Sequence, residues 1–199
     1  MGFYADLEQM NRFLEKLRED SRVFAPKCFH GEGRFSDTDC IRYGEISCME
    51  EVVLDQKSQY SFKEILNPVS QTLFFFTEDQ VKEPEIPAKG AVIFIRSCDI
   101  HSLKRLDDMY LKNGPADYYY SRLRENLKII LIGCSQSFEN CFCVSMGTNR
   151  SEGYQLSIDR TEDGGYRMDC RDESWEKLLE ELGCRREQAE PSYVAENTV

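Results

Sequence analysis

Four of the nine cysteines in the sequence are spaced as the ligands of a metal group could be. Cys134, Cys141 and Cys143 fall in one short stretch with the spacing C-x6-C-x-C, and Cys98 precedes them in the chain. Thiolates bind iron–sulfur clusters and tetrahedral zinc. The spacing differs from the run of bacterial ferredoxins and from the paired cysteines of zinc ribbons. We therefore expect these four cysteines to hold a [4Fe–4S] cluster, with zinc as the alternative.

Two apolar runs indicate how the four thiols could meet. Ala91–Ile95 and Leu127–Ile132 are continuous runs of the kind found in strands buried on both faces. Cys98 lies just after the first run, and Cys134 lies just after the second. A helix that begins with Asp99 as its N-cap is predicted between them, which gives a βαβ unit with parallel strands. Both cysteines would then emerge at the same carboxyl edge of the sheet, where ligands of open α/β sheets collect.

The other cysteines and both histidines are predicted to lie outside this site. A free cysteine usually behaves as a small buried hydrophobe. We expect His30 to make an ordinary surface hydrogen bond and His101 to pack or face solvent. No motif positions a base beside Cys141 or Cys143, which disfavours a thiol enzyme, and no catalytic residue is predicted. The cysteines predicted to lie outside the site are Cys28, Cys40, Cys48, Cys170 and Cys184.

The rest of the pattern predicts an α/β fold with a mixed sheet that contains the parallel βαβ unit. No repeat or linker divides the chain, so we expect residues 1–199 to form a single domain. An amphipathic helix is expected at the N-terminus, and a hairpin followed by a helix at the C-terminus. The expected helices are 3–18, 99–113, 118–126 and 173–182. The further strands are 22–25, closed by Pro26, a buried strand or strand end at 73–76, and the hairpin strands 154–158 and 166–168.

Charge and composition exclude several classes of function. The formal net charge of −11 disfavours a nucleic-acid-binding surface, because such proteins gather Lys and Arg on one face. No run is long and apolar enough to cross a bilayer, and no secretory signal is present, so we expect no membrane association and a cytoplasmic protein. Disulfides are disfavoured in the cytoplasm, so nine cysteines favour metal or redox chemistry. Neither a dinucleotide fingerprint nor a P-loop is present.

Several segments resemble the iron–sulfur electron-transfer subunit of anaerobic sulfite reductase, and more distantly the β subunits of cytoplasmic sulfhydrogenases. The most specific is the run from Phe138 to Thr148, which includes Cys141 and Cys143. The segments that carry the resemblance are Gly33–Asp39, Thr72–Phe76, Cys98–Ile100, Arg105–Leu111, Ser137–Asn149 and Pro191–Asn197.

The resemblance implies an electron-transfer role within a larger complex. In that family, electrons pass from a flavin-containing, NADH-oxidising subunit toward a sirohaem subunit that reduces sulfite. The family also carries a C-terminal ferredoxin-like domain with two [4Fe–4S] motifs, and the cysteines of that domain are absent from residues 1–199. Because the sequence shows neither a sirohaem-binding pattern nor a nucleotide site, we expect an electron-transfer component that is not catalytic alone. The alternative is a docking scaffold of a reductase or hydrogenase complex, with a zinc-bound or empty cysteine site.

Overall fold

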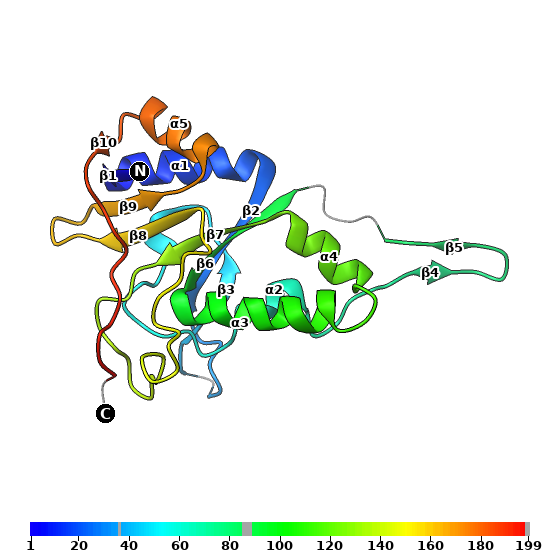
Figure 1. Ribbon diagram of the computed structural model, residues 1–199. Coiled ribbons are helices and arrows are strands. Elements are labelled where there is room, and N and C mark those ends of the chain that lie inside the picture. The colour runs from blue at the N-terminus through cyan, green and yellow to red at the C-terminus, as the bar shows by residue number, and fades with distance from the viewer. Residues whose placement is uncertain (36, 85–88, 198–199) are drawn as a thin grey trace.

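The computed structural model describes residues 1–35, 37–84 and 89–197 (Figure 1). Ser36, within the Gly33–Asp39 motif, therefore lies outside the described residues. The strands are β1 (Gly2–Ala5), β2 (Ser21–Phe29), β3 (Cys40–Glu45), β4 (Phe75–Phe76), β5 (Val81–Lys82), β6 (Gly90–Arg96), β7 (Leu127–Ile132), β8 (Leu156–Arg160), β9 (Tyr166–Cys170) and β10 (Arg185–Arg186). The helices are α1 (Leu7–Asp20), α2 (Lys63–Leu66), α3 (Ser97–Asp107), α4 (Tyr118–Glu125) and α5 (Glu173–Glu181), with a 3-10 turn η1 (Met49–Glu51) and a π-helical turn η2 (Asp108–Lys112).

The main sheet is mixed, as the sequence predicts. Within the described residues its order is β10-β1-β9-β8-β7-β6-β2-β3. Strands β2, β6, β7 and β8 form consecutive parallel pairs, and the outer pairs are antiparallel. The predicted parallel pairing of β6 with β7 is therefore confirmed, and α3 and α4 lie between these two strands in the chain. The C-terminal hairpin β8–β9 and the helix α5 are also present.

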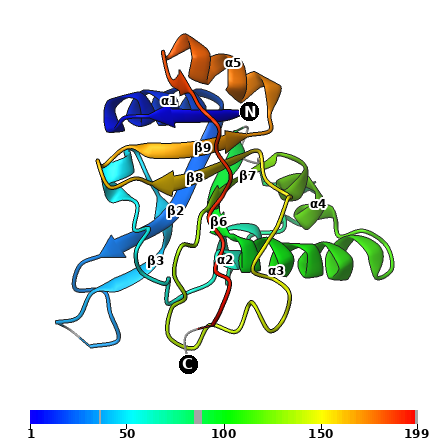
Figure 2. The same ribbon diagram turned by 60° about the vertical axis from the view of Figure 1, so that its left-hand side comes forward.

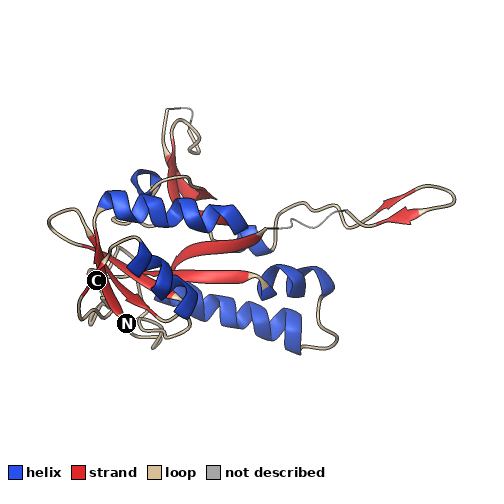
Figure 3. Ribbon diagram, turned by 90° about the horizontal axis from the view of Figure 1, so that it is seen from above, coloured by secondary structure: helices blue, strands red, loops and turns tan. Residues whose placement is uncertain are grey.

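The central strands are buried on both faces, which explains why their sequences are continuously apolar. In β6, Val92 and Phe94 belong to a core beneath α1 and α5, whereas Ile93 and Ile95 belong to a second core beneath α2, α3 and α4. Strand β7 alternates in the same way. Figure 3 shows the strands between these two helical layers. The central sheet is therefore held from both sides, and its carboxyl edge is a fixed platform.

The N-terminal helix begins later than predicted. Residues Gly2–Ala5 form strand β1 at the side of the sheet, and α1 starts at Leu7. Asp6 caps it, because its carboxylate accepts from the Gln9 backbone N–H at 2.8 Å while the Gln9 side chain accepts from the Asp6 backbone N–H at 3.0 Å. This capping box outweighs the helical spacing of Phe3, which is buried in the sheet instead.

Two predictions around the strands also need correction. Strand β2 does not end at Pro26 but continues to Phe29. Proline is tolerated there because β2 pairs with β6 only as far as Phe24, so no neighbour on that side needs a proline N–H. Helix α3 follows β6 without a loop and begins at Ser97, so Asp99 lies in its first turn and is not its N-cap.

The segment Leu73–Phe76 is exposed, contrary to the prediction of a buried strand. Phe75 and Phe76 form β4, whose one strand partner in the described part of the chain is β5, and Phe76 is 74% exposed. The β4–β5 hairpin extends away from both helical layers (Figures 1 and 3). The apolar run therefore reflects an exposed projection and not a core strand.

Within the described part of the chain, none of the helices has the length and apolar character needed to span a membrane.

Candidate metal centre at the sheet edge

The four cysteines predicted to form one site line a single cavity of about 360 Å³ at the carboxyl edge of the sheet. Cys98 comes from the first turn of α3, directly after β6, and Cys134 lies two residues beyond β7. Cys141 and Cys143 come from the loop that follows. Cys98 is open to the cavity, and the other three thiols are half-buried. The opposite wall comprises the segment Gln56–Phe62.

The loop that carries three of the cysteines is anchored by tight packing at Gly133. A Cβ atom at this position would lie 1.9 Å from Asp159 Oδ1, so only glycine leaves room for that carboxylate. Asp159 Oδ2 in turn accepts a hydrogen bond from the Ser192 backbone N–H at 3.0 Å. The Ser192 carbonyl accepts from the Cys134 backbone N–H at 2.8 Å. The position of Cys134 therefore depends on β8 and on the C-terminal segment.

The C-terminal segment also braces the rest of the loop. The Asn149 side chain donates to the Val194 carbonyl at 2.8 Å, and Asn197 Oδ1 accepts from the Val144 backbone N–H at 3.2 Å. Figures 1 and 2 show the chain end running beside this loop. Long-range contacts thus hold a loop that has no sheet ladder of its own.

The loop turns where the cysteine spacing requires it. Asn140 has a φ of 62°, and the next backbone N–H, that of Cys141, bonds to the Phe138 carbonyl at 3.1 Å. The Thr148 backbone N–H then bonds to the Cys143 carbonyl at 2.8 Å. Alternate residues of a regular strand face opposite sides, so this irregular path is what allows Cys141 and Cys143 to line one cavity.

Arg96 places a positive charge in direct contact with one of the four thiols. Its guanidinium donates to Cys134 Sγ at 3.5 Å and to the Leu54 carbonyl at 2.7 Å, and it lies over the Phe138 ring at 4.5 Å from the centroid. These contacts hold a positive charge against the site. The N-terminus of α3, which carries Cys98, adds partial positive charge at the same place.

Without a bound cation, the surroundings of Cys98 and Cys134 disfavour the ionised thiolate form of these two side chains. Burial, the nearby Asp99 and the three other thiols together raise the pKa of Cys98 from 9.0 to about 12, and burial has the largest effect. Cys98 is accessible through the cavity but otherwise surrounded by protein, which is why burial dominates. Burial also raises the pKa of Cys134, although Arg96 opposes this effect. Binding of a metal group would supply the positive charge that four thiolates need.

The remaining cysteines do not line this cavity in the described residues. Cys40, Cys170 and Cys184 are buried, and the latter two belong to the core beneath α1 and α5. His101 also lies outside, because its Nε2 contacts the Arg150 carbonyl at 2.7 Å. Burial raises the pKa of Asp99, and the Arg96 backbone N–H opposes this.

Sequence reasoning missed one group of side chains. Cys28, His30 and Asp39 lie together at the end of the β2–β3 hairpin, where their ligand atoms are within 4.8 Å of one another. His30 makes the expected surface hydrogen bond, at 2.9 Å to Asp39, but this partner could not be read from the sequence. The available signal was the C-x-H spacing, which puts two side chains on one face of a strand.

Comparison with known proteins supports a relationship with one of the two families that the sequence resembles. No protein-family model matches the chain. The chain is 31% identical over 159 residues to sulfhydrogenase 2 subunit beta of Pyrococcus furiosus. That alignment covers 79% of this chain and 45% of the relative, so the chain spans less than half the length of the relative.

Proposed function

We propose that Cys98, Cys134, Cys141 and Cys143 bind a [4Fe–4S] cluster, and that the chain is an electron-transfer component of an oxidoreductase complex. The observation that carries this proposal is the convergence of four thiols on one cavity, one from the start of α3 and three from the loop after β7. The donor set fits such a cluster, because four cysteine thiolates are its usual ligands. A cluster bound there would accept and release one electron at a time.

The residues around the cavity suit this role. Arg96 and the N-terminus of α3 stabilise negative charge on the thiolates. The buried walls restrict water, which tunes the reduction potential of a cluster. The cysteine loop also exposes Phe142 and Met146, which offer apolar contact to an electron-transfer partner.

We further propose that the complex is a cytoplasmic, NADH-dependent anaerobic sulfite reductase. In this proposal the chain passes electrons from a flavin subunit toward a sirohaem subunit. The support is the resemblance of the run Phe138–Thr148 to the iron–sulfur electron-transfer subunit of that enzyme, while the similarity to a sulfhydrogenase subunit supports the broader electron-transfer role.

Anaerobic reconstitution with iron and sulfide tests the cluster. We expect a brown protein with about four irons and four sulfides per chain that bleaches on reduction. Replacing any one of the four cysteines with serine should lower both contents strongly. Cys48→Ser is the matched control, because Cys48 is half-buried and lies outside the cavity. A colourless protein that binds zinc through the same four cysteines would contradict the cluster and favour the docking scaffold.

The proposed reaction needs a separate test with the assembled complex. Mixed with flavin and sirohaem subunits, the reconstituted chain should support NADH-dependent formation of sulfide from sulfite. The chain alone with a strong reductant should form none above buffer. Sulfide formation at full rate without this chain would refute the proposed electron path.

A further inference from the structure

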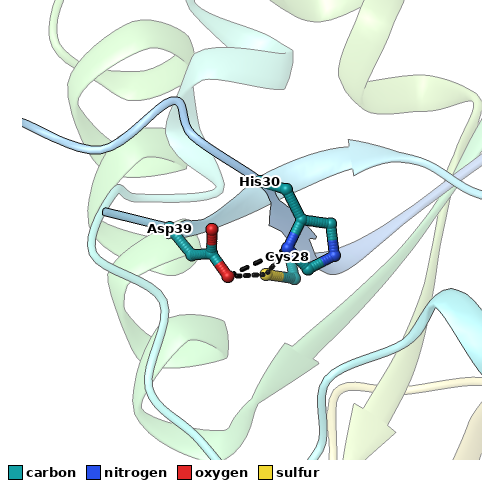
Figure 4. A group of neighbouring side chains, drawn as sticks. All are labelled: Cys28, His30 and Asp39. Carbon is teal, nitrogen blue, oxygen red and sulfur yellow. Dashed lines mark hydrogen bonds and ion pairs between the residues drawn. The ribbon is translucent and has the colours of Figure 1, made fainter. Parts of the chain in front are cut away.

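The second group of ligand-type side chains lies on the β2–β3 hairpin, on elements that contribute no cysteine to the cavity. Cys28 Sγ is 3.8 Å from His30 Nδ1 and 3.7 Å from Asp39 Oδ2, and His30 Nδ1 is 2.9 Å from Asp39 Oδ2. Figure 4 shows the three side chains pointing toward one another. A thiol, an imidazole and a carboxylate thus converge on one point.

The hairpin itself brings these residues together. Cys28 and His30 are two residues apart, so they fall on the same face of the strand and its extension. The last pair of the β2–β3 ladder is Phe29 with Cys40, which brings Asp39 opposite His30. The Gly31 backbone N–H donates to Asp39 Oδ1 at 3.0 Å and leaves Oδ2 facing the other two groups. The backbone N–H points at Asp39 because Gly31 has a φ of 70°, a left-handed conformation that glycine adopts without steric cost.

The geometry differs from that of a nucleophilic triad. In a triad the two histidine nitrogens serve different partners, whereas here the thiol and the carboxylate both approach Nδ1. One nitrogen cannot accept the thiol proton while donating its own hydrogen to the carboxylate. Three groups that face one point are instead the arrangement of metal ligands.

The spacings agree with tetrahedral coordination. Zinc–ligand bonds of roughly 2.0–2.3 Å at tetrahedral angles separate the ligand atoms by roughly 3.4–3.6 Å. The two distances to Cys28 Sγ, 3.8 and 3.7 Å, are close to this range. The shorter distance between His30 and Asp39 is that of a direct hydrogen bond, which a bound cation would replace.

We propose that Cys28, His30 and Asp39 form a site for a divalent cation that accepts mixed sulfur, nitrogen and oxygen ligands, with zinc as the best match. The three protein ligands leave a fourth position for water. The site faces solvent, since the His30 side chain is 83% exposed and that of Asp39 is 53% exposed. None of the three residues lines the cysteine cavity, so this site is independent of the proposed cluster.

The charges at the site suit a cation. Asp39 supplies a carboxylate, whose Oδ1 accepts a hydrogen bond from the Gly31 backbone N–H at 3.0 Å. Cys28 supplies a thiol that lies 3.7 Å from Asp39 Oδ2. A bound cation would displace the thiol proton to the solvent as the metal–sulfur bond forms.

Titration of the full, cluster-loaded chain with Co²⁺ as a coloured substitute for zinc tests the proposal. We expect one equivalent to bind with the absorption of a tetrahedral thiolate complex, while the iron and sulfide contents stay constant. Zinc added afterwards should displace the cobalt. Cys28→Ser should abolish the thiolate absorption, and His30→Ala and Asp39→Asn should each weaken binding at least tenfold.

Two features of the design keep the result decisive. Cys48→Ser is the matched control and should bind cobalt as the unaltered chain does. His30→Ala changes a largely exposed side chain and should fold even if Cys28→Ser does not. Cobalt affinity that is unchanged in His30→Ala, or a spectrum that lacks thiolate absorption in the unaltered chain, would overturn the site.

Discussion

The four-cysteine cavity and the Cys28–His30–Asp39 group differ in how much of the fold positions their side chains. The four thiols of the cavity come from the start of α3 and from the loop after β7, and the placement of Cys134 depends on Ser192 near the chain end. The hairpin group comes from one β2–β3 connection and a local hydrogen bond to Gly31. The first group is therefore sensitive to changes far from it, whereas the second responds only to its own hairpin.

Because of this difference, an effect on the supporting fold can be distinguished from a general effect on metal binding. A distant substitution that loosens the C-terminal segment would disturb the cavity and leave the hairpin group intact. Substitutions that affect only one of the two sites therefore report on the structure that supports that site. The following predictions use this contrast.

The largest effect is expected for Gly133→Ala. The new Cβ would lie 1.9 Å from Asp159 Oδ1 and would displace the carboxylate that holds Ser192. Such overpacking lowers the free energy of unfolding by about 1–3 kcal/mol. Bound iron should fall markedly, while cobalt binding at the hairpin should persist. Urea unfolding and iron analysis measure both. Gly153→Ala is the control, because its Cβ would meet Ile100 at an ordinary 3.4 Å; an equal loss of iron in both variants would contradict the prediction.

Arg96→Met should change the electronic character of the cavity. The guanidinium contacts Cys134 Sγ and favours added negative charge. Its removal should lower the midpoint potential of a bound cluster, by about 40 mV if the lost stabilisation is about 1 kcal/mol. A redox titration followed by absorption measures this shift. Arg96→Lys, which keeps the charge, should shift the potential less, and a higher potential in Arg96→Met would refute the role.

Acid pH should weaken the support of strand β2 through Glu51. The ion pair with Lys27 lowers the pKa of Glu51 from 4.5 to about 2. Because the folded-state pKa is lowered, the pair stabilises the fold above about pH 4.5 and loses its effect as the pH falls toward 2. Glu51→Gln should cost about 1 kcal/mol at neutral pH and reduce this acid dependence. Urea unfolding across this range is the measurement. Glu45→Gln, in an exposed pair with Arg22, should change little.

The smallest effect is expected for His101→Ala. His101 follows the cavity residue Cys98 within the same helix but donates to the Arg150 carbonyl at 2.7 Å. Loss of this hydrogen bond should lower the free energy of unfolding by about 1 kcal/mol or less. Iron content should not change, as measured by chemical analysis. A loss of iron comparable with that of Cys98→Ser would make His101 part of the metal centre.

The sequence predicted that the four cysteines of the cavity lie together, and it did not indicate the Cys28–His30–Asp39 group. The apolar runs before Cys98 and Cys134 indicated two buried strands, and parallel pairing then followed from the intervening helices. Strand β3 has no comparable run, so its pairing with β2 and the position of Asp39 opposite His30 could not be inferred. Periodicity reports burial, and it says little about the register of an edge hairpin.

Local signals also competed in ways that spacing alone does not resolve. Phe3 fits the helical period of α1, but the capping box at Asp6 starts the helix after it. The aromatic run Phe74–Phe76 has the composition of a core strand and is exposed. In the first case a local capping box decided where the helix begins, and in the second case the apolar composition of the run did not predict its exposure.

The projecting β4–β5 hairpin gives the chain a natural point of division. The segment before it supplies β1, β2 and β3, and the segment after it supplies β6 to β10. In the sheet, β1 from the N-terminal segment lies beside β9, and β2 from the same segment lies beside β6. The strands β6 to β9 of the C-terminal segment are therefore flanked on both sides by strands of the N-terminal segment. A protease cut in the exposed hairpin should therefore yield two fragments that stay associated. The protein is thus suited to fragment complementation, in which two separately made polypeptides reassemble into one sheet.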